Sequence, residues 1–301
     1  MNYTQLMNNK TKIFVGSMFL LGIIIGGAIF YFYTKIPKLQ PTTSLSTTNT
    51  QPPPLTTSTA STITANLKNI PIAVGFQLGV DWFNSWATKN DMMVIFGDNF
   101  TDTTHPKTCQ LAWNAPSFTN VMSSVNQWKG KVNTVLYDYE TWEKTPASEQ
   151  ADPAQAARTA QSFCDANGIQ LIMGASWKMV TVKGAAKILR GNPAGVNWSG
   201  IIDKAKIQSI AKSVRSFGVN ASGLRRENPE QYIDFFNLVA SYAKEVNPTI
   251  KLWPVLDARS QSADKMLEMV NKLQGNIDGV TIMGNEKDKA VISSLISMLR
   301  K

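Results

Sequence analysis

Short hydrophobic runs recur along the chain from about residue 69 onward. Seven of them have the length of a strand and few polar interruptions: 72–78, 92–97, 132–139, 169–174, 217–221, 250–256 and 277–283. Such continuous runs are typical of strands that are buried on both faces, whereas half-exposed strands alternate polar and apolar residues. The pattern therefore predicts a parallel sheet whose faces are covered by other elements.

Helical patterns separate several of these runs. Asp152 is a good N-cap, Pro153 suits the first helical position, and Gln155 completes a capping box. This helix is expected to end near Asn167, because Gly168 is a typical stop. Three later stretches carry apolar residues at helical spacing: 229–246, 264–273 and 291–299.

Strands and helices thus alternate over about 230 residues, which favours a TIM-like (β/α)₈ barrel. Only seven strands are evident. The eighth unit is expected to be irregular or incomplete, or to lie in the poorly patterned region 177–209. A doubly wound open sheet is the alternative, but neither G-x-G-x-x-G after the first strand nor a P-loop pattern is present.

A different pattern precedes this domain. After a short tail at residues 1–12, residues 13–33 form an uncharged apolar run of 21 residues, which as a helix spans roughly 30 Å, the thickness of a bilayer core. We predict an uncleaved transmembrane helix. A cleaved signal peptide is the alternative, but the run is long for the apolar region of such a peptide.

Orientation follows from the flanking charges. Lys10, Lys12 and the terminal amine slightly outweigh Lys35 and Lys38, which favours a cytoplasmic N-terminus. Residues 34–66 are rich in Pro, Thr and Ser and are typical of a disordered stalk or linker. The sequence therefore predicts a single-pass protein of the cell membrane, with the bilayer as a partner and residues 67–301 as an extracytoplasmic domain.

Charge and histidine content exclude several classes of function. The net charge is +9, but residues 1–66 hold four lysines and no acid, which leaves a mild +5 on the remaining 235 residues. Without a dense basic face, nucleic-acid binding is not expected. His105 is the only histidine, so two-histidine metal sites are excluded, and no G-x-S-x-G elbow accompanies it. Acid–base chemistry therefore falls to carboxylates, Tyr or Lys.

Neither a cofactor nor a resident metal is expected. A carboxylate site for a hard cation such as Ca²⁺ is a weaker alternative, since such ions need only oxygen ligands. Cys109 and Cys164 either form a disulfide, which an extracytoplasmic setting would permit, or remain two separate buried thiols.

The best candidates for chemistry end the run at 132–139. Leu136, Asp138 and Glu140 alternate along one face, and carboxylates do not easily face an apolar helix layer, so they should face the barrel mouth. Two like charges so close should raise one pKa and give one acid and one base, the pair that glycoside hydrolysis needs. Alternatively, Asp138 accepts backbone hydrogen bonds and Glu140 pairs with one of the arginines at 225, 226 and 259.

Six further residues near expected strand ends are candidates for substrate binding: Trp82, Trp142, Trp177, Asp98, Asp257 and Glu227. Flat aromatic faces can stack on the C–H face of a sugar ring with little loss of rotamer freedom. Asp98 and Asp257 could also supply a second carboxylate from another strand. For any single tryptophan, sealing a loop against the barrel is the more common use, but several of them at one end of the barrel favour a binding surface.

The stretch Tyr137–Pro153, YDYETWEKTPASEQADP, resembles a largely uncharacterised family of exported archaeal and bacterial proteins. Its members share Y-D-x-E-x-W, then T-P, then E-Q-x-D-P; Trp142 matches only with a one-residue change in spacing. The resemblance continues through Val219–Tyr232 and the pair Asn247-Pro248. It implies a glycoside-hydrolase-like TIM barrel outside the cytoplasm and carries over no catalytic residue.

Together these features predict a membrane-anchored, extracytoplasmic protein that uses Asp138 and Glu140 on carbohydrate. The alternative is a non-catalytic glycan-binding or cell-envelope structural protein on the same scaffold. The substrate and the oligomeric state are not encoded in any pattern that we recognise.

Overall fold

The structure is a computed structural model that describes residues 67–75, 78–97, 105–182, 185 and 196–301. The tail at 1–12, the expected transmembrane helix at 13–33 and the linker at 34–66 lie outside the described residues. Within the described ranges, no helix is both long and apolar enough to cross a membrane.

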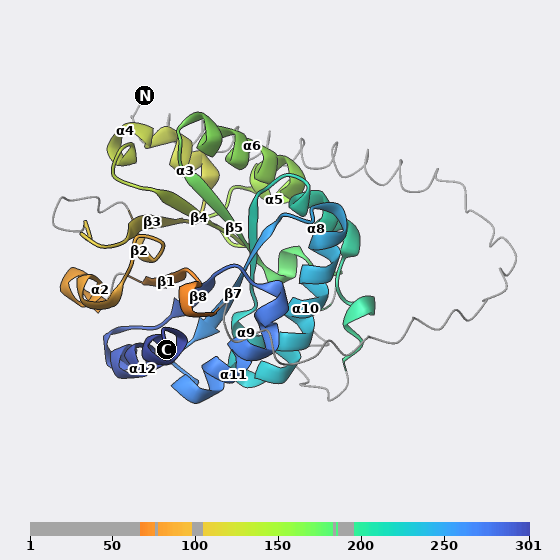
Figure 1. Ribbon diagram of the computed structural model, residues 1–301. Coiled ribbons are helices and arrows are strands. Elements are labelled where there is room, and N and C mark those ends of the chain that lie inside the picture. The colour runs from red at the N-terminus through yellow and green to blue at the C-terminus, as the bar shows by residue number, and fades with distance from the viewer. Residues whose placement is uncertain (1–66, 76–77, 98–104, 183–184, 186–195) are drawn as a thin grey trace, which may run out of the picture. The chain divides into compact units, whose positions relative to one another are not determined.

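Eight parallel strands form a closed barrel in which each strand pairs with the next and the last pairs with the first (Figure 1). The strands are β1 Ile72–Gly75, β2 Met92–Phe96, β3 Gln110–Ala115, β4 Thr134–Tyr139, β5 Gln170–Ser176, β6 Ser216–Asn220, β7 Lys251–Asp257 and β8 Val280–Met283. The closure confirms the predicted (β/α)₈ barrel and rules out the open doubly wound sheet.

The eighth strand is β3, and the expectation that it lies within 177–209 was wrong. Its sequence, QLAWNA, alternates instead of forming a continuous apolar run. Gln110 and Asn114 face inward at the two ends of the barrel, while Trp113 faces the helices and is buried. Trp113 therefore belongs to the core.

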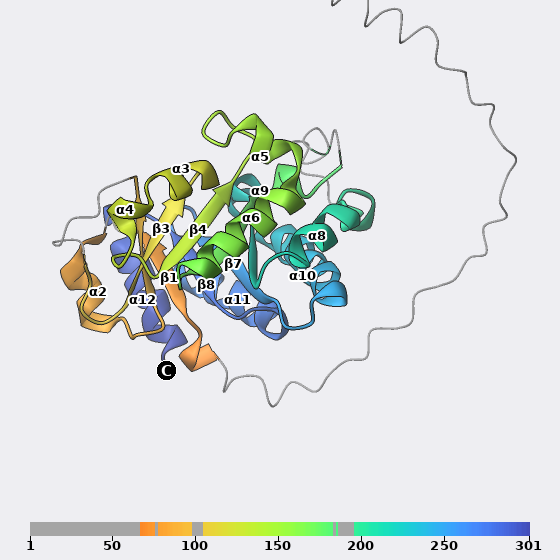
Figure 2. The same ribbon diagram turned by 90° about the horizontal axis from the view of Figure 1, so that it is seen from above.

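Helices surround the barrel (Figure 2). The α-helices are α2 Val80–Trp86, α3 Phe118–Ser123, α4 Val125–Trp128, α5 Ala147–Ala151, α6 Pro153–Ala166, α8 Lys204–Ala211, α9 Ser222–Glu227, α10 Pro229–Val246, α11 Ala263–Leu273 and α12 Lys289–Leu299. Short 3₁₀ turns are η1 Leu67–Asn69, η4 Trp177–Met179, η5 Trp198–Gly200, η6 Gln274–Asn276 and η7 Glu286–Asp288. Neighbouring helices pack on one another, with α10 in contact with α8, α9 and α11.

The predicted start of α6 is confirmed. The Asp152 side chain accepts a hydrogen bond from the backbone N–H of Gln155 at 2.9 Å, and Pro153 takes the first helical position. The helix is followed by Gly168, whose φ of 68° lies in the left-handed region. The second arm of the expected capping box differs, because the Gln155 side chain donates to Thr159 Oγ1 at 3.2 Å instead.

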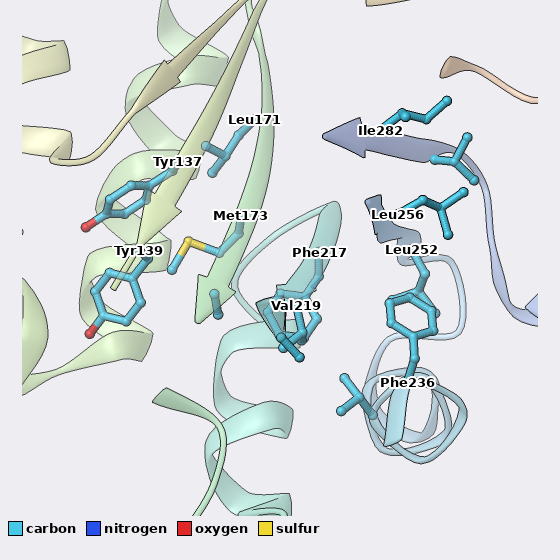
Figure 3. Packing of buried hydrophobic residues seen from close by; sticks show 14 of the residues in the cluster. Tyr137, Tyr139, Leu171, Met173, Phe217, Val219, Phe236, Leu252, Leu256 and Ile282 are labelled. Atoms are coloured by element: carbon cyan, nitrogen blue, oxygen red, sulfur yellow. The ribbon is translucent and has the colours of Figure 1, made fainter. Parts of the chain in front are cut away.

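Two hydrophobic clusters hold the barrel together. The larger one lies between the strands and the helices, and Figure 3 shows part of it, with Tyr137 and Tyr139 projecting from the same side of β4. The smaller cluster fills the barrel interior and consists of Ala73, Met92, Val94, Ala112, Leu136, Ile172 and Trp253. Most of these interior side chains are small or aliphatic, and the indole of Trp253 fills the space that they leave.

Two glycines make room for Trp253. A Cβ at Gly279 would lie 2.5 Å from carbons of the indole, and one at Gly218 would meet the carbonyl oxygen of the same residue. Real Cβ atoms do not approach other atoms this closely, and the indole is enclosed at 5% exposure, so it has little room to retreat. A side chain at either position would therefore force a shift of the barrel interior.

Gly279→Ala is expected to lower the free energy of unfolding by about 1–3 kcal/mol, the usual effect of overpacking a filled core. Gly223 in α9 is the matched control, because a Cβ there meets no atom within 4 Å. Gly223→Ala should leave stability unchanged or raise it slightly, since alanine is the better helix former. Urea denaturation of both variants measures the difference, and equal stabilities would contradict the steric account.

The two cysteines are free thiols, as in the second of the two sequence-based alternatives. Cys164 is fully buried in α6, and burial raises its pKa to about 12. Cys109 is half-buried just before β3, where burial raises its pKa to about 11. Neither thiol is therefore ionised to a useful extent at neutral pH.

Candidate active site

The mouth of the barrel, at the C-terminal ends of the strands, contains the predicted carboxylate pair. Asp138 is inward-facing on β4 and lines a pocket at the mouth, with Leu136 one step below it in the interior cluster. Tyr137 and Tyr139 face the helix layer. The predicted facing of this strand is therefore confirmed. Glu140 follows directly after the strand.

The outward tyrosines of β4 are fixed by Glu149 of α5. Tyr137 donates its hydroxyl hydrogen bond to the Glu149 carboxylate, and Tyr139 donates to the Glu149 carbonyl oxygen at 2.8 Å. The same carboxylate accepts from the backbone N–H groups of Phe118 at 3.0 Å and Thr119 at 2.8 Å. Burial opposes ionisation of Glu149, but these hydrogen bonds outweigh it and lower its pKa. This carboxylate, which the sequence did not single out, thus anchors the strand that carries the pair.

Asp138 and Glu140 hydrogen bond with each other, and each has a neutral amide as a further partner. Asn114 Nδ2 donates to Asp138 Oδ2 at 3.4 Å, and Asn220 Nδ2 donates to Glu140 Oε1 at 3.2 Å. Burial raises the pKa of both carboxyl groups, and the charge of Asp138 raises that of Glu140 further. Two carboxyl groups this close do not both ionise easily, so the pair holds one proton more strongly than a single carboxyl group would.

A buried arginine determines how Asn220 is oriented. Arg225 Nη1 donates to Asn220 Oδ1, so the amide must present its NH₂ group to Glu140. Arg225 is in turn held by Asp257, whose Oδ2 lies 3.3 Å from Nη2. Among the described residues, no arginine forms an ion pair with Asp138 or Glu140. Asp257, Arg225, Asn220 and Glu140 are thus linked in sequence, and the last link is a hydrogen bond from a neutral amide. The negative charge of the carboxylate pair is therefore not neutralised by a direct ion pair with Arg225.

Asp257, a predicted substrate-binding residue, is fully buried at the end of β7. Arg259 donates to it twice, at 2.7 and 2.8 Å, and Arg226 Nε lies 3.8 Å away. Burial opposes its ionisation, but the hydrogen bonds from Arg259 and the charges of Arg225 and Arg259 outweigh it and lower the pKa. The arginines that the sequence offered as partners for Glu140 thus gather on Asp257, which acts on the site through Arg225.

The mouth pocket is a hollow of about 60 Å³ beside the pair. Its walls include the polar side chains of Asn114, Asp138 and Asn220 and the ring of Phe96. Phe96 ends β2, faces inward and is 45% exposed, which is unusual for a phenylalanine. An exposed aromatic ring beside a carboxylate can serve as a stacking surface for a ligand.

Sequence reasoning missed Phe96 and Asn114 for different reasons. Phe96 ends a run that looked buried throughout, although counting inward positions from Met92 in steps of two reaches it. Asn114 lies on the strand that the apolar pattern did not reveal. Asn220 was visible at a strand end, but nothing in the sequence indicates that it contacts Glu140.

The three candidate tryptophans have local packing roles and do not line the mouth pocket. Trp82 in α2 donates its indole N–H to Ser293 Oγ of α12 at 3.0 Å. Trp142, in the loop after β4, donates to Thr145 Oγ1 at 2.8 Å. Trp177 begins η4 directly after β5 and packs partly buried against the core. The structure thus leaves their part in substrate binding as a prediction.

Of the remaining acidic candidates, Glu227 is exposed at the end of α9, and Asp98 lies outside the described residues. No group of three or more His, Cys, Asp and Glu side chains suited to a metal ion occurs in the described part of the chain. Asp138 and Glu140 are therefore the two candidates that the structure brings together.

Comparison with known proteins identifies no family for this chain. No protein-family model matches this chain, and no curated protein sequence does. Solved structures with similar folds include a candidate fructose-1,6-biphosphate aldolase from Coccidioides immitis, at 8% identity and TM-score 0.42, covering 79% of this chain and 91% of that one.

Others are carboxyl transferase domains of Rhizobium etli pyruvate carboxylase. The structure with 3-bromopyruvate has 10% sequence identity and a TM-score of 0.45, and the match covers 78% of this chain and 47% of that one. The structure with 3-hydroxypyruvate has 10% sequence identity and a TM-score of 0.44, and the match covers 79% of this chain and 48% of that one. The chain thus spans about half the length of these carboxylase chains.

Proposed function

We propose that the barrel domain is a glycan-cleaving enzyme in which Glu140 donates a proton to the glycosidic oxygen while Asp138 stays ionised beside it. The observation that carries the proposal is the hydrogen-bonded pair at the barrel mouth, with raised pKa values and amide partners in place of arginines. A carboxyl group that holds its proton to a higher pH than an ordinary one is suited to act as a general acid.

The spacing of the pair limits the mechanism. Retaining glycosidases place their two carboxyl groups about 5–5.5 Å apart and inverting ones about 6.5–9.5 Å apart, with the sugar between them. Carboxyl groups that share a hydrogen bond are closer than either value. Asp138 and Glu140 must therefore approach the substrate from one side, and the attacking oxygen must come from the other.

The proposed step follows from this geometry. The proton moves from Glu140 to the glycosidic oxygen as the bond from that oxygen to the anomeric carbon breaks, and the leaving sugar departs as an alcohol. Asp138 stabilises the positive charge that develops on the ring. Water then adds to the anomeric carbon from the opposite face and releases its proton to the solvent, and Glu140 takes up a proton from the solvent before the next turnover. The exposed ring of Phe96 supports this role, because it offers a surface on which a sugar can stack.

The setting is a second part of the proposal. Residues 13–33 would span the bilayer, residues 34–66 would link them to the domain at 67–301, and the domain would lie on the outer surface of the cell membrane. The uncharged run of 21 residues supports this arrangement, as does the resemblance of Tyr137–Pro153 to exported glycoside-hydrolase-like barrels. The partners would be the bilayer and a surface glycan.

A non-catalytic glycan-binding or envelope protein is the second candidate. The size of the mouth pocket favours it, because about 60 Å³ is small beside the roughly 300–1,000 Å³ of ordinary ligand sites. On this reading the pair would hold a glycan without cleaving it. Turnover separates the two candidates.

The test uses the full-length chain, purified in detergent and incubated with a panel of cell-surface glycans, with new reducing ends measured. We expect release from at least one glycan by the wild type and none by Asp138→Asn or Glu140→Gln. Circular dichroism checks that both variants are folded. Binding without release would establish the second candidate, and release that persists in both variants would overturn the roles given to the pair.

A further inference from the structure

A second, larger cavity lies at the opposite end of the barrel, where the strands begin. It has a volume of about 440 Å³, within the usual range for small-molecule sites. Its rim is formed by the first inward-facing residues of several strands and by the residues just before them. We call it the lower cavity. It does not include Asp138 or Glu140, so any role that it has is independent of the proposed cleavage.

The rim of the lower cavity is polar. Four of its side chains form no hydrogen bond or ion pair with any other described residue: Asn90, Gln170, Ser216 and Lys251. The other polar rim residues are already engaged. Arg215 forms a two-point ion pair with Asp165, and Gln110 donates to the carbonyl oxygen of Lys89. Four side chains with free donors and acceptors therefore line one hollow, and three of them, Asn90, Gln170 and Lys251, are exposed.

The inner wall of the lower cavity is apolar. Met92, Ile172 and Trp253 line it from the barrel interior. A ligand in this cavity would have an apolar face against this wall and polar groups directed to the rim. This combination of an apolar, partly aromatic wall with a few polar groups is typical of sites for small organic ligands.

The charges of the rim favour a neutral ligand. Lys251 is the one cation lining the cavity that has no acidic partner in the described part of the chain, because Arg215 is neutralised by Asp165. Asp278 lines the same cavity and would repel an anion; one of its oxygens accepts from the backbone N–H of Leu252, which leaves acceptor capacity on the other. Amides, a hydroxyl, an ammonium and a carboxylate together match hydroxyl groups, which both donate and accept.

We propose that the lower cavity is a binding site for a neutral monosaccharide or the end residue of a neutral glycan. The hydroxyl groups of the ring would bond to Asn90, Gln170, Ser216 and Lys251, and its C–H face would lie toward Met92 and Trp253. The site holds a sugar and does no chemistry, because no carboxylate pair lines it.

The experiment titrates the full-length chain with glucose, galactose, mannose and N-acetylglucosamine, with glucuronate as the anionic probe and glycerol as the size control. Ligand-observed NMR and indole fluorescence report binding. We expect at least one neutral sugar to bind, and the double variant Lys251→Ala/Gln170→Ala to weaken it at least tenfold. Both side chains are exposed, so this variant should fold normally.

Glu268→Ala, on the exposed surface of α11 and outside both cavities, is the matched control and should bind the same sugar with unchanged affinity. A sugar that binds the double variant as tightly as the wild type would overturn the proposal. So would binding of glucuronate in preference to every neutral sugar, or no binding of any probe. Because the readout is affinity at the lower cavity, these outcomes are distinct from a failure to cleave glycans at the mouth.

Discussion

Glu140→Gln is expected to lower the rate of glycan cleavage by about 10²–10⁴-fold, the usual contribution of a positioned general acid. Glutamine keeps the shape of the side chain and its contact with Asn220, but it has no proton to give to the leaving oxygen. The Michaelis constant should change much less than kcat, because the group acts on the bond being broken. A loss of the same size in kcat/KM that came only from a higher Michaelis constant, with kcat unchanged, would contradict the acid role.

The pKa of Glu140 gives an independent test of the same pair. Burial raises it first and the charge of Asp138 second, while the charge of Lys178 lowers it. Asp138→Asn should therefore lower the pKa of Glu140, and Lys178→Ala should raise it. Carboxyl carbon NMR titration measures both shifts without any need for activity. In the wild type, the alkaline side of the pH–rate profile should follow the same group, and activity should fall as Glu140 loses its proton.

Asp257→Ala is expected to lower the free energy of unfolding by about 3–5 kcal/mol. Arg225 is only 1% exposed and would lose its carboxylate partner, which leaves a buried charge without compensation. The loss should also loosen Asn220 and so disturb Glu140. Chemical denaturation gives the first effect, and the NMR titration of Glu140 gives the second.

The matched control is Glu268→Ala. Glu268 forms ion pairs with Lys265 and Lys272 on the surface of α11, where solvent screens them, so this change should have little effect on stability. Similar losses in both variants would contradict the special role of the buried network.

The stabilising effect of Asp257 should depend on pH in a definite direction. Its pKa in the folded protein is lowered, so the folded state favours the ionised form over the protonated one. Its contribution is complete above the pKa of the unfolded chain, about 3.9, and is lost as the pH falls through the lower folded value. The difference in stability between the wild type and Asp257→Ala should therefore be constant near neutral pH and shrink in acid.

Local sequence patterns predicted much of the barrel. Strands such as β2 and β7 are buried on both faces, so their apolar runs are continuous and easy to find. The alternation in β4 placed Asp138 correctly at the mouth. The start of α6 also follows from a few neighbouring residues. These features depend on contacts within one element or on the simple contrast between buried and exposed positions.

The parts that the sequence did not predict depend on contacts between distant segments. Each end of strand β3 faces an open cavity and carries a polar inward-facing residue there. These polar residues interrupt the apolar run that would have revealed the strand. Asn114 and Asn220 reach the pair from other strands, 24 and 80 residues away in the chain. Likewise, the choice of Asp257 over Glu140 as the partner of Arg225 is set by the barrel register and not by proximity in sequence.

The indole of Trp253 has a further consequence for the barrel as a whole. Trp253 and Ile172 line both the mouth pocket and the lower cavity, so a thin apolar septum separates the two ends of the barrel. A smaller residue at 253 would leave Gly279 facing empty space and open a passage along the barrel axis, whereas a side chain at Gly279 would collide with the indole. Positions 253 and 279 are thus coupled, and a larger residue at 279 fits only when the residue at 253 becomes smaller, whereas Gly218 faces a backbone carbonyl that every residue at 253 would present.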